Sequence, residues 1–133
     1  MRRTLAGLLL IAAIACGSDS STSEPDVQMT GTWSLQSVNG GALPYLVQTT
    51  PSKIELLSDV FVMATGGFVE TSIVRTTTGT SITLDTARDV GTYTVKGSAT
   101  TFMWASDGSS AVVAVTGNTF TAKSGSTSFI YSR

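Results

Sequence analysis

The sequence has no histidine and a single cysteine, Cys16, among its 133 residues. Histidine is the side chain most often used as a general base and as a metal ligand near neutral pH. A lone cysteine has no partner for an internal disulfide or for a thiolate metal site. Serines are abundant, but none lies in the Gly-x-Ser-x-Gly pattern of a nucleophilic hydrolase. We therefore predict no catalytic residue, no metal site and no cofactor, and we expect that the protein is not an enzyme.

Paired carboxylates are the remaining candidates for acid–base chemistry. Glu55 and Glu70 flank a hairpin signal at Gly66-Gly67 and can approach each other across that hairpin, although a paired-carboxylate hydrolase needs a separation of roughly 5–9 Å. Charges on neighbouring strands usually belong to a solvated outer face, and we interpret this pair in that way. Asp85 and Asp89 match no calcium-loop spacing and are predicted to lie in an ordinary turn.

Basic charge is scarce as well. After removal of residues 1–15, which include Arg2 and Arg3, the chain has six basic and nine acidic residues and a formal charge of −3. The chain therefore lacks the basic stripe of a nucleic-acid-binding protein and the Lys/Arg cluster that attaches proteins to anionic lipid. We expect no nucleic-acid partner.

The first 28 residues have the organisation of an exported, anchored protein. Basic residues at positions 2 and 3 precede an apolar run from Leu5 to Ala15, which is typical of an export signal and is shorter than the roughly 20 residues of a membrane-spanning helix. The stretch Ala13-Ile14-Ala15-Cys16 resembles a bacterial lipobox. The resemblance implies cleavage of a signal peptide (residues 1–15) and lipid attachment at Cys16. The plain secretory signal with an incidental cysteine is the alternative.

Residues 16–28 are polar and rich in Ser, Thr, Asp and Glu, so they predict a flexible tether that cannot bury enough apolar surface to fold. With acyl chains on Cys16, the partner of this segment would be a bacterial membrane. Gly17 replaces the aspartate that resembles an inner-membrane retention signal, which favours the outer membrane in a host with two membranes.

Long helical patterns are missing from residues 29–133. Ser and Thr make up about a third of the chain after residue 15, and turn residues recur at roughly ten-residue spacing. The pattern predicts an all-β domain with an antiparallel meander of about eight strands, either a small barrel or a β-sandwich. The segment 39–51 is expected to fold over an open end or to pair briefly at an edge. A turn is expected between two short strands at 85–89.

Gly31-Thr32-Trp33 opens the first predicted strand, and Arg133 follows the last one in the stretch FIYSR. This combination resembles the lipocalin and wider calycin pattern, and the chain as a whole is similar to small bacterial lipoproteins with lipocalin-like domains. The resemblance implies an eight-stranded barrel in which Trp33 and Arg133 form a structural pair that closes one end. The chain departs from it in its short length and in the absence of a second loop motif and a trailing helix.

A barrel of this kind predicts a small hydrophobic ligand. The aromatic residues that would line its site are Tyr93, Phe102, Trp104, Phe120 and Tyr131. The alternative is a non-catalytic interaction or structural module of the cell envelope without a ligand, for which the Ser/Thr-rich surface is suited and whose protein partner the sequence does not identify. A ligand carrier leaves an interior cavity of a few hundred Å³, whereas a structural module has a filled interior.

Overall fold

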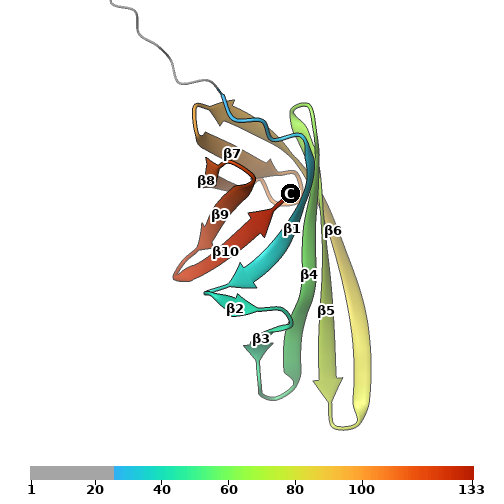
Figure 1. Cartoon of the computed structure of the whole chain (residues 1–133). Coiled ribbons are helices and arrows are strands. Elements are labelled where there is room, and N and C mark those ends of the chain that lie inside the picture. Colours follow the sequence, from blue (N-terminus) through green and yellow to red (C-terminus); the bar gives the residue numbers. More distant parts are fainter. Residues whose placement is uncertain (1–25) are drawn as a thin grey trace, which may run out of the picture.

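The computed structural model describes residues 26–133 as an all-β domain (Figure 1). The predicted signal peptide, the lipid-attachment residue Cys16 and most of the predicted tether lie outside the described residues. In the described part of the chain, no helix has the length and apolar character needed to cross a bilayer. The strands are β1 (Gly31–Val38), β2 (Gly41–Ala42), β3 (Tyr45–Gln48), β4 (Lys53–Ala64), β5 (Gly67–Thr78), β6 (Ser81–Lys96), β7 (Ala99–Trp104), β8 (Ser110–Thr116), β9 (Thr119–Ser124) and β10 (Thr127–Ser132).

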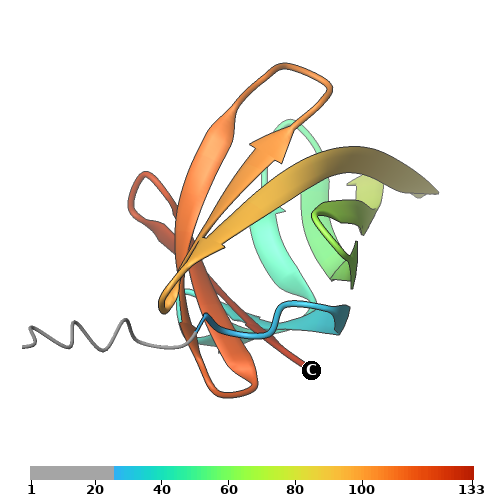
Figure 2. The ribbon, with the colours of Figure 1, turned by 90° about the horizontal axis from the view of Figure 1, so that it is seen from above.

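Eight of these strands form a closed antiparallel barrel. Strands β4 to β10 follow one another as a meander, and β1 closes the ring by pairing with β10 on one side and with β4 on the other. Trp33 lies opposite Phe61 of β4, and Leu35 lies opposite Tyr131 of β10. The view along the barrel shows the resulting ring (Figure 2). The prediction of an eight-stranded meander is confirmed, and the barrel is realised instead of the β-sandwich.

Strands β2 and β3 are the two additions to the barrel, and both come from the segment predicted as a long connection. Strand β2 pairs with the end of β1, and β3 pairs with the start of β4, where Tyr45 lies opposite Leu56. The segment therefore pairs briefly at an edge, as one of the two sequence-based expectations stated.

The prediction of a turn at 85–89 is wrong. Strand β6 runs without interruption from Ser81 to Lys96, and its residues Ser81–Thr92 pair with β5 along the whole length of that strand. This continuous ladder of backbone hydrogen bonds overrides the local preference of Asp85 and Asp89 for turns. Strand β7 pairs with β6 only from Gly91 onward. The lower half of β6 is therefore a free edge, visible in Figure 1 as the long arm below the barrel.

Asp26 and Val27, the first residues that the structure describes, already contact the barrel ahead of the expected start of the domain at Met29. The amide of Val27 donates to the carbonyl of Gly97 at 3.1 Å, and the amide of Gly97 donates to the carboxylate of Asp26 at 2.8 Å. These bonds attach the entering chain to the turn between β6 and β7. The segment that precedes β1 thus joins the barrel at the end where the turn between β6 and β7 lies.

Aromatic side chains fill the closed part of the barrel. Trp33 and Phe120 are 0% exposed and Phe102 is 1% exposed. The Phe120 and Tyr131 rings stack with centroids 4.6 Å apart, and Trp33 lies 5.1 Å from Phe120. Aromatic pairs of this kind each contribute about 0.5–1.5 kcal/mol beyond the burial of their area. The Trp33 indole N–H is satisfied by donating to the carbonyl of Met29 at 2.8 Å.

Position 91 has to be a glycine because neighbouring atoms lie too close to it for a side chain. A Cβ atom at Gly91 would overlap the carbonyl oxygen of Met103 and the ring of Phe68. Without a side chain, Gly91 lets the Phe68 ring lie across β6 and reach Phe102 at a centroid distance of 5.3 Å. The Phe68 ring also lies 5.6 Å from that of Trp104, so both tryptophans belong to one aromatic cluster.

Candidate functional site

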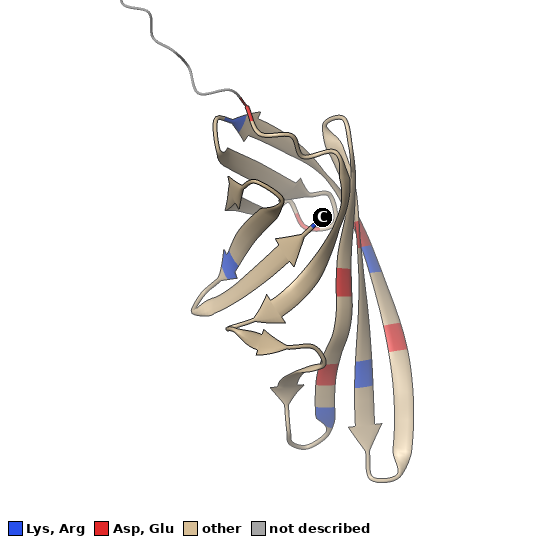
Figure 3. Cartoon of the chain, in the orientation of Figure 1, with Lys and Arg blue, Asp and Glu red and all other residues tan. Residues whose placement is uncertain are grey.

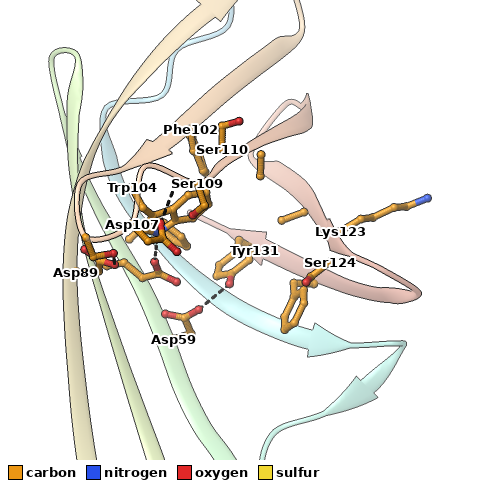
Figure 4. Close-up of a pocket in the computed structure, with 16 residues that line it drawn as sticks. Asp59, Asp89, Phe102, Trp104, Asp107, Ser109, Ser110, Lys123, Ser124 and Tyr131 are labelled. Atoms are coloured by element: carbon orange, nitrogen blue, oxygen red, sulfur yellow. Dashed lines mark hydrogen bonds between the residues drawn. The ribbon is translucent and has the colours of Figure 1, made fainter.

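The open end of the barrel contains a cavity of about 440 Å³ (Figure 4). Its walls come from β4, β5 and β6 on one side and from β7 to β10 and the loop after β7 on the other. Aromatic side chains form its apolar part: Phe61, Phe102, Trp104, Phe129 and Tyr131.

The structure places the five predicted lining residues in two groups. Phe102, Trp104 and Tyr131 line the cavity. Phe120 does not, because it lies beneath the cavity between the rings of Trp33 and Tyr131. Tyr93 does not either, because its hydroxyl turns to the carbonyl of Ala64 and donates to it at 2.7 Å.

The predicted structural pair lies outside the cavity. The Arg133 guanidinium carbon lies 4.7 Å from the centroid of the Trp33 ring, and its Nη1 donates to the carbonyl of Thr30 at 3.1 Å. This geometry combines a cation–π contact with a hydrogen bond across the chain ends. The pair therefore ties the start of β1 to the residue that follows β10.

Carboxylates make up the polar part of the cavity. The register places Glu70 of β5 opposite Phe61 of β4 and opposite Asp89 of β6, so that all three side chains share the inner face. Asp59 precedes Phe61 by two positions and lies on the same face. Asp107, in the loop after β7, is the fourth acidic residue of the lining. In Figure 3, both acidic and basic positions lie along the neighbouring strands β4, β5 and β6.

Asp59 is the most deeply buried of these acids, with 7% of its surface exposed. The Tyr131 hydroxyl donates to its Oδ2 at 2.7 Å. Its Oδ1 receives a hydrogen bond from no donor within residues 26–133. Burial raises the pKa of the Asp59 carboxyl, and burial with the nearby carboxylate raises the pKa of the Tyr131 phenol.

Glu70 is held beside Asp59. The Trp104 indole N–H donates to Glu70 Oε2 at 2.5 Å. Burial, followed by repulsion from Asp59 and Asp89, raises the pKa of Glu70 to about 7. Asp59 and Glu70 are therefore two neighbouring acids in a partly buried site, and each makes it unfavourable for the other to carry a negative charge. With a pKa of about 7, the Glu70 carboxyl keeps its proton in about half of the molecules at neutral pH.

The remaining two acids are fixed by the loop that follows β7. The Ser106 hydroxyl donates to Asp89 Oδ2 at 2.5 Å, and the amide of Val90 donates to Asp89 Oδ1 at 2.8 Å. Hydrogen bonds from Ser109 lower the pKa of Asp107, whose Oδ1 accepts from the Ser109 amide at 2.8 Å. Asp89 and Asp107 are therefore held at the mouth of the cavity.

The interpretation of Glu55 and Glu70 as part of a solvated outer face is wrong for Glu70, which lines the cavity. The two do not approach each other either, because the register pairs Glu55 with Arg75 and Glu70 with Phe61. Glu55 accepts salt bridges from Lys53 and Arg75, each at 2.8 Å, and these bonds lower the pKa of its carboxyl. The acid that faces Glu70 is Asp59, which the sequence analysis missed. Its signal was the alternation of Asp59 with Phe61 and Met63, which places a charge in the buried phase of the strand.

The acidic side chains do not form a metal centre of recognisable composition. Across residues 26–133, no group of three or more His, Cys, Asp or Glu side chains is arranged to hold a metal ion. Comparison of the chain with protein-family models, with curated proteins and with solved structures finds no match in any of the three. The site is thus an aromatic cavity with carboxylates from β4, β5 and β6 along one side.

Proposed function

We propose that this chain binds a small ligand in the open end of its barrel, and that lipid on Cys16 holds the barrel at a bacterial membrane. The observation that carries the first part is the cavity of about 440 Å³ lined by aromatic side chains. This volume lies within the range of about 300–1,000 Å³ typical of small-molecule sites. A barrel whose task was only structural would gain stability by filling this space with side chains.

The proposal agrees with the resemblance carried by the sequence. An eight-stranded meander closed by β1 is compatible with a lipocalin-like barrel, and Arg133 over Trp33 has the geometry that the resemblance implies. The lipobox-like stretch before Cys16 supports the membrane anchor and export to the cell envelope. We therefore favour a bacterial lipoprotein with a lipocalin-like domain.

Ligand binding is tested with a pair of substitutions on one strand. Ala111 of β8 lines the cavity, whereas Ala114 faces outward and is exposed. The chain from residue 16 onward, with Cys16→Ser, would be titrated with the neutral fluorescent probe N-phenyl-1-naphthylamine. We expect saturable binding that Ala111→Phe abolishes and that Ala114→Phe preserves. Equal binding by both variants would place the probe outside the cavity, and absence of saturable binding in all three proteins would count against a carrier.

A second candidate function is an interaction module of the cell envelope. Residues Ser81–Val90 of β6 pair with β5 alone, and Ile82 and Leu84 on this edge are each 64% exposed. A free edge with exposed apolar side chains is a template for strand addition by another chain. Replacing Leu84 with Lys would abolish such an association in cross-linking from intact cells while leaving probe binding in the cavity intact.

A further inference from the structure

We infer that the ligand of this cavity carries a positive charge, as an ammonium or guanidinium group on an apolar or aromatic body. The inference rests on the proposed ligand-binding function and names the class of ligand. It differs from the neutral, purely hydrophobic ligand that the sequence predicts. Four lines of evidence lead to it: an unsatisfied acceptor, the charge balance of the lining, its aromatic content and its division into two sides.

The unsatisfied acceptor is Oδ1 of Asp59. Asp59 is 7% exposed and lines the cavity, and this oxygen receives no hydrogen bond within residues 26–133. Buried polar atoms are nearly always satisfied by a partner. Burial and the neighbouring Asp59 and Asp89 raise the pKa of the Glu70 carboxyl to about 7. A group with several N–H donors and a positive charge would satisfy both carboxylates at once.

The charge balance of the cavity lining is strongly acidic. Its charged side chains are one lysine, Lys123, and the four acids Asp59, Glu70, Asp89 and Asp107. Figure 4 shows the Lys123 side chain running away from the labelled aspartates, and Lys123 itself is exposed. Its ammonium group is therefore not placed to neutralise them. Like charges lining a partly enclosed site concentrate ions of the opposite sign there.

The aromatic rings complete the description of the ligand. Five aromatic side chains line the same cavity, including Trp104, whose indole N–H is already used by Glu70. Aromatic faces attract cations as well as apolar groups. A neutral ligand would use the rings and leave the carboxylates unpaired, whereas a fatty acid would place its own carboxylate against them.

The two sides of the cavity suggest an orientation. In Figure 4, Asp59 and Asp89 lie toward β4, β5 and β6, whereas Lys123 and Ser124 lie on the opposite side. Phe129 belongs to the lining as well and comes from β10. The charged group of the ligand would therefore lie against β4, β5 and β6, with its body extending toward β9 and β10.

Binding of a cation would displace the proton that Glu70 holds. The titratable and charged groups around this carboxyl are Asp59 on β4, Asp89 on β6, Asp107 in the loop after β7, Lys123 on β9 and Tyr131 on β10. Because Glu70 has a pKa of about 7, a cation should bind more tightly at pH 8 than at pH 6. The ligand-free protein near pH 7 should release up to about half a proton for each cation bound.

The test uses three probes with the same phenylalkyl body and different charge: 4-phenylbutylamine, 4-phenylbutanol and 4-phenylbutyrate. They would be titrated by calorimetry into the chain from residue 16 onward carrying Cys16→Ser, at pH 6 and pH 8. We expect the amine to bind at least tenfold more tightly than the alcohol at pH 8, with the advantage reduced at pH 6. The carboxylate should bind most weakly.

Two aspartate substitutions connect the preference to the site. Asp59→Asn should reduce affinity for the amine about tenfold and leave affinity for the alcohol unchanged, whereas Asp85→Asn should change neither. Asp85 is the matched control because it is exposed on β6 and lies outside the cavity lining. Should Asp59→Asn fail to fold, as judged by circular dichroism, Asp89→Asn at the mouth of the cavity replaces it, with a smaller loss of the same sign.

The outcomes separate this inference from the proposed function. Equal affinities for the amine and the alcohol would overturn the cationic ligand and leave a small-molecule carrier in place. An amine preference that Asp59→Asn and Asp89→Asn both leave intact would also overturn it, because the charge would then be recognised elsewhere. Absence of binding by all three probes would count against both proposals.

Discussion

Glu70→Gln should stabilise the protein at pH 8, although it replaces a hydrogen-bonded residue of the site. The pKa of Glu70 is about 7 in the folded protein against an ordinary value of 4.5. Between these values the folded state binds more protons than the unfolded chain, so stability is fully present below pH 4.5 and is lost as the pH rises through 7. The difference between the two pKa values corresponds to about 3 kcal/mol of unfolding free energy. Because Glu70 is only part-buried, screening by water reduces the expected loss to about 1–2 kcal/mol.

Glutamine reproduces the protonated form of Glu70. Its carbonyl oxygen can accept from the Trp104 indole, and its amide can donate to the Asp59 carboxylate, at every pH. We therefore expect Glu70→Gln to match the wild type at pH 5 and to exceed it by about 1–2 kcal/mol at pH 8. Urea unfolding followed by tryptophan fluorescence at pH 5, 6, 7 and 8 measures the difference. Because the pKa of Asp59 is raised as well, the unfolding free energy of the variant should still fall as the pH rises.

Glu55→Gln is the matched control on the same pair of strands. Salt bridges with Lys53 and Arg75 lower the pKa of Glu55, so its contribution is present above its unfolded pKa and is lost as the pH falls through the lower folded value. This substitution should therefore destabilise the protein at neutral pH and lose its effect in acid. The raised pKa of Glu70 is refuted if Glu70→Gln destabilises the protein at pH 8, as Glu55→Gln does. It is also refuted if the unfolding free energy of the wild type rises from pH 5 to pH 8.

Three further predictions concern the packing, the barrel end and the anchor. Gly91→Ala should cost about 1–3 kcal/mol in urea unfolding, because its Cβ would overlap a strand carbonyl and a ring. Gly67→Ala, whose Cβ has an ordinary 3.5 Å contact, should lie within about 0.5 kcal/mol of the wild type; equal losses would contradict the overlap. Arg133→Met should lose about 0.5–1 kcal/mol of unfolding free energy through the contact with Trp33, and an unchanged value would show that contact to be energetically neutral. Mass spectrometry of the protein from its native host should show loss of residues 1–15 and added acyl chains that Cys16→Ser abolishes; an unacylated mature chain would refute the anchor.

The fold was predictable because its signals are local. Turn residues separate alternating strands, and Gly66 lies in the turn between β4 and β5 with a positive φ of 75°. Most strands of the meander pair with their sequence neighbours, so that reading the turns in order reproduces the topology. The error at 85–89 arose because two aspartates favour turns locally, whereas a complete neighbouring strand was available to pair with them.

The carboxylates of Asp59, Glu70 and Asp89 on one side of the cavity could not be predicted in the same way. Their position depends on which face of each strand turns inward when the barrel closes. From the hairpin turn to Ser58 the register is unshifted and places Glu70 opposite Phe61, two residues from Asp59, whereas the bulge between Leu56 and Ser58 lies beyond this stretch. A shift of one residue in a strand moves every side chain to the opposite face. The sequence analysis considered Glu70 only with Glu55 and assigned both to a solvated face, whereas three of its five aromatic candidates line the cavity.

The closing of the ring by β1 has a consequence for the timing of assembly. Every neighbour pair from β4 to β10 forms between consecutive strands, but Ser34 of β1 has to meet Ser132 of β10, almost the whole domain away. Contacts so distant in sequence make folding slow, because a long loop must be closed before they form. In a chain that is exported from its amino end, β1 would reach the far side of the membrane first and find its second neighbour last. Until β1 pairs with β10, the aromatic core remains exposed between these two strands. A chaperone that protects the core at this stage would bind β1, the strand that is exported first.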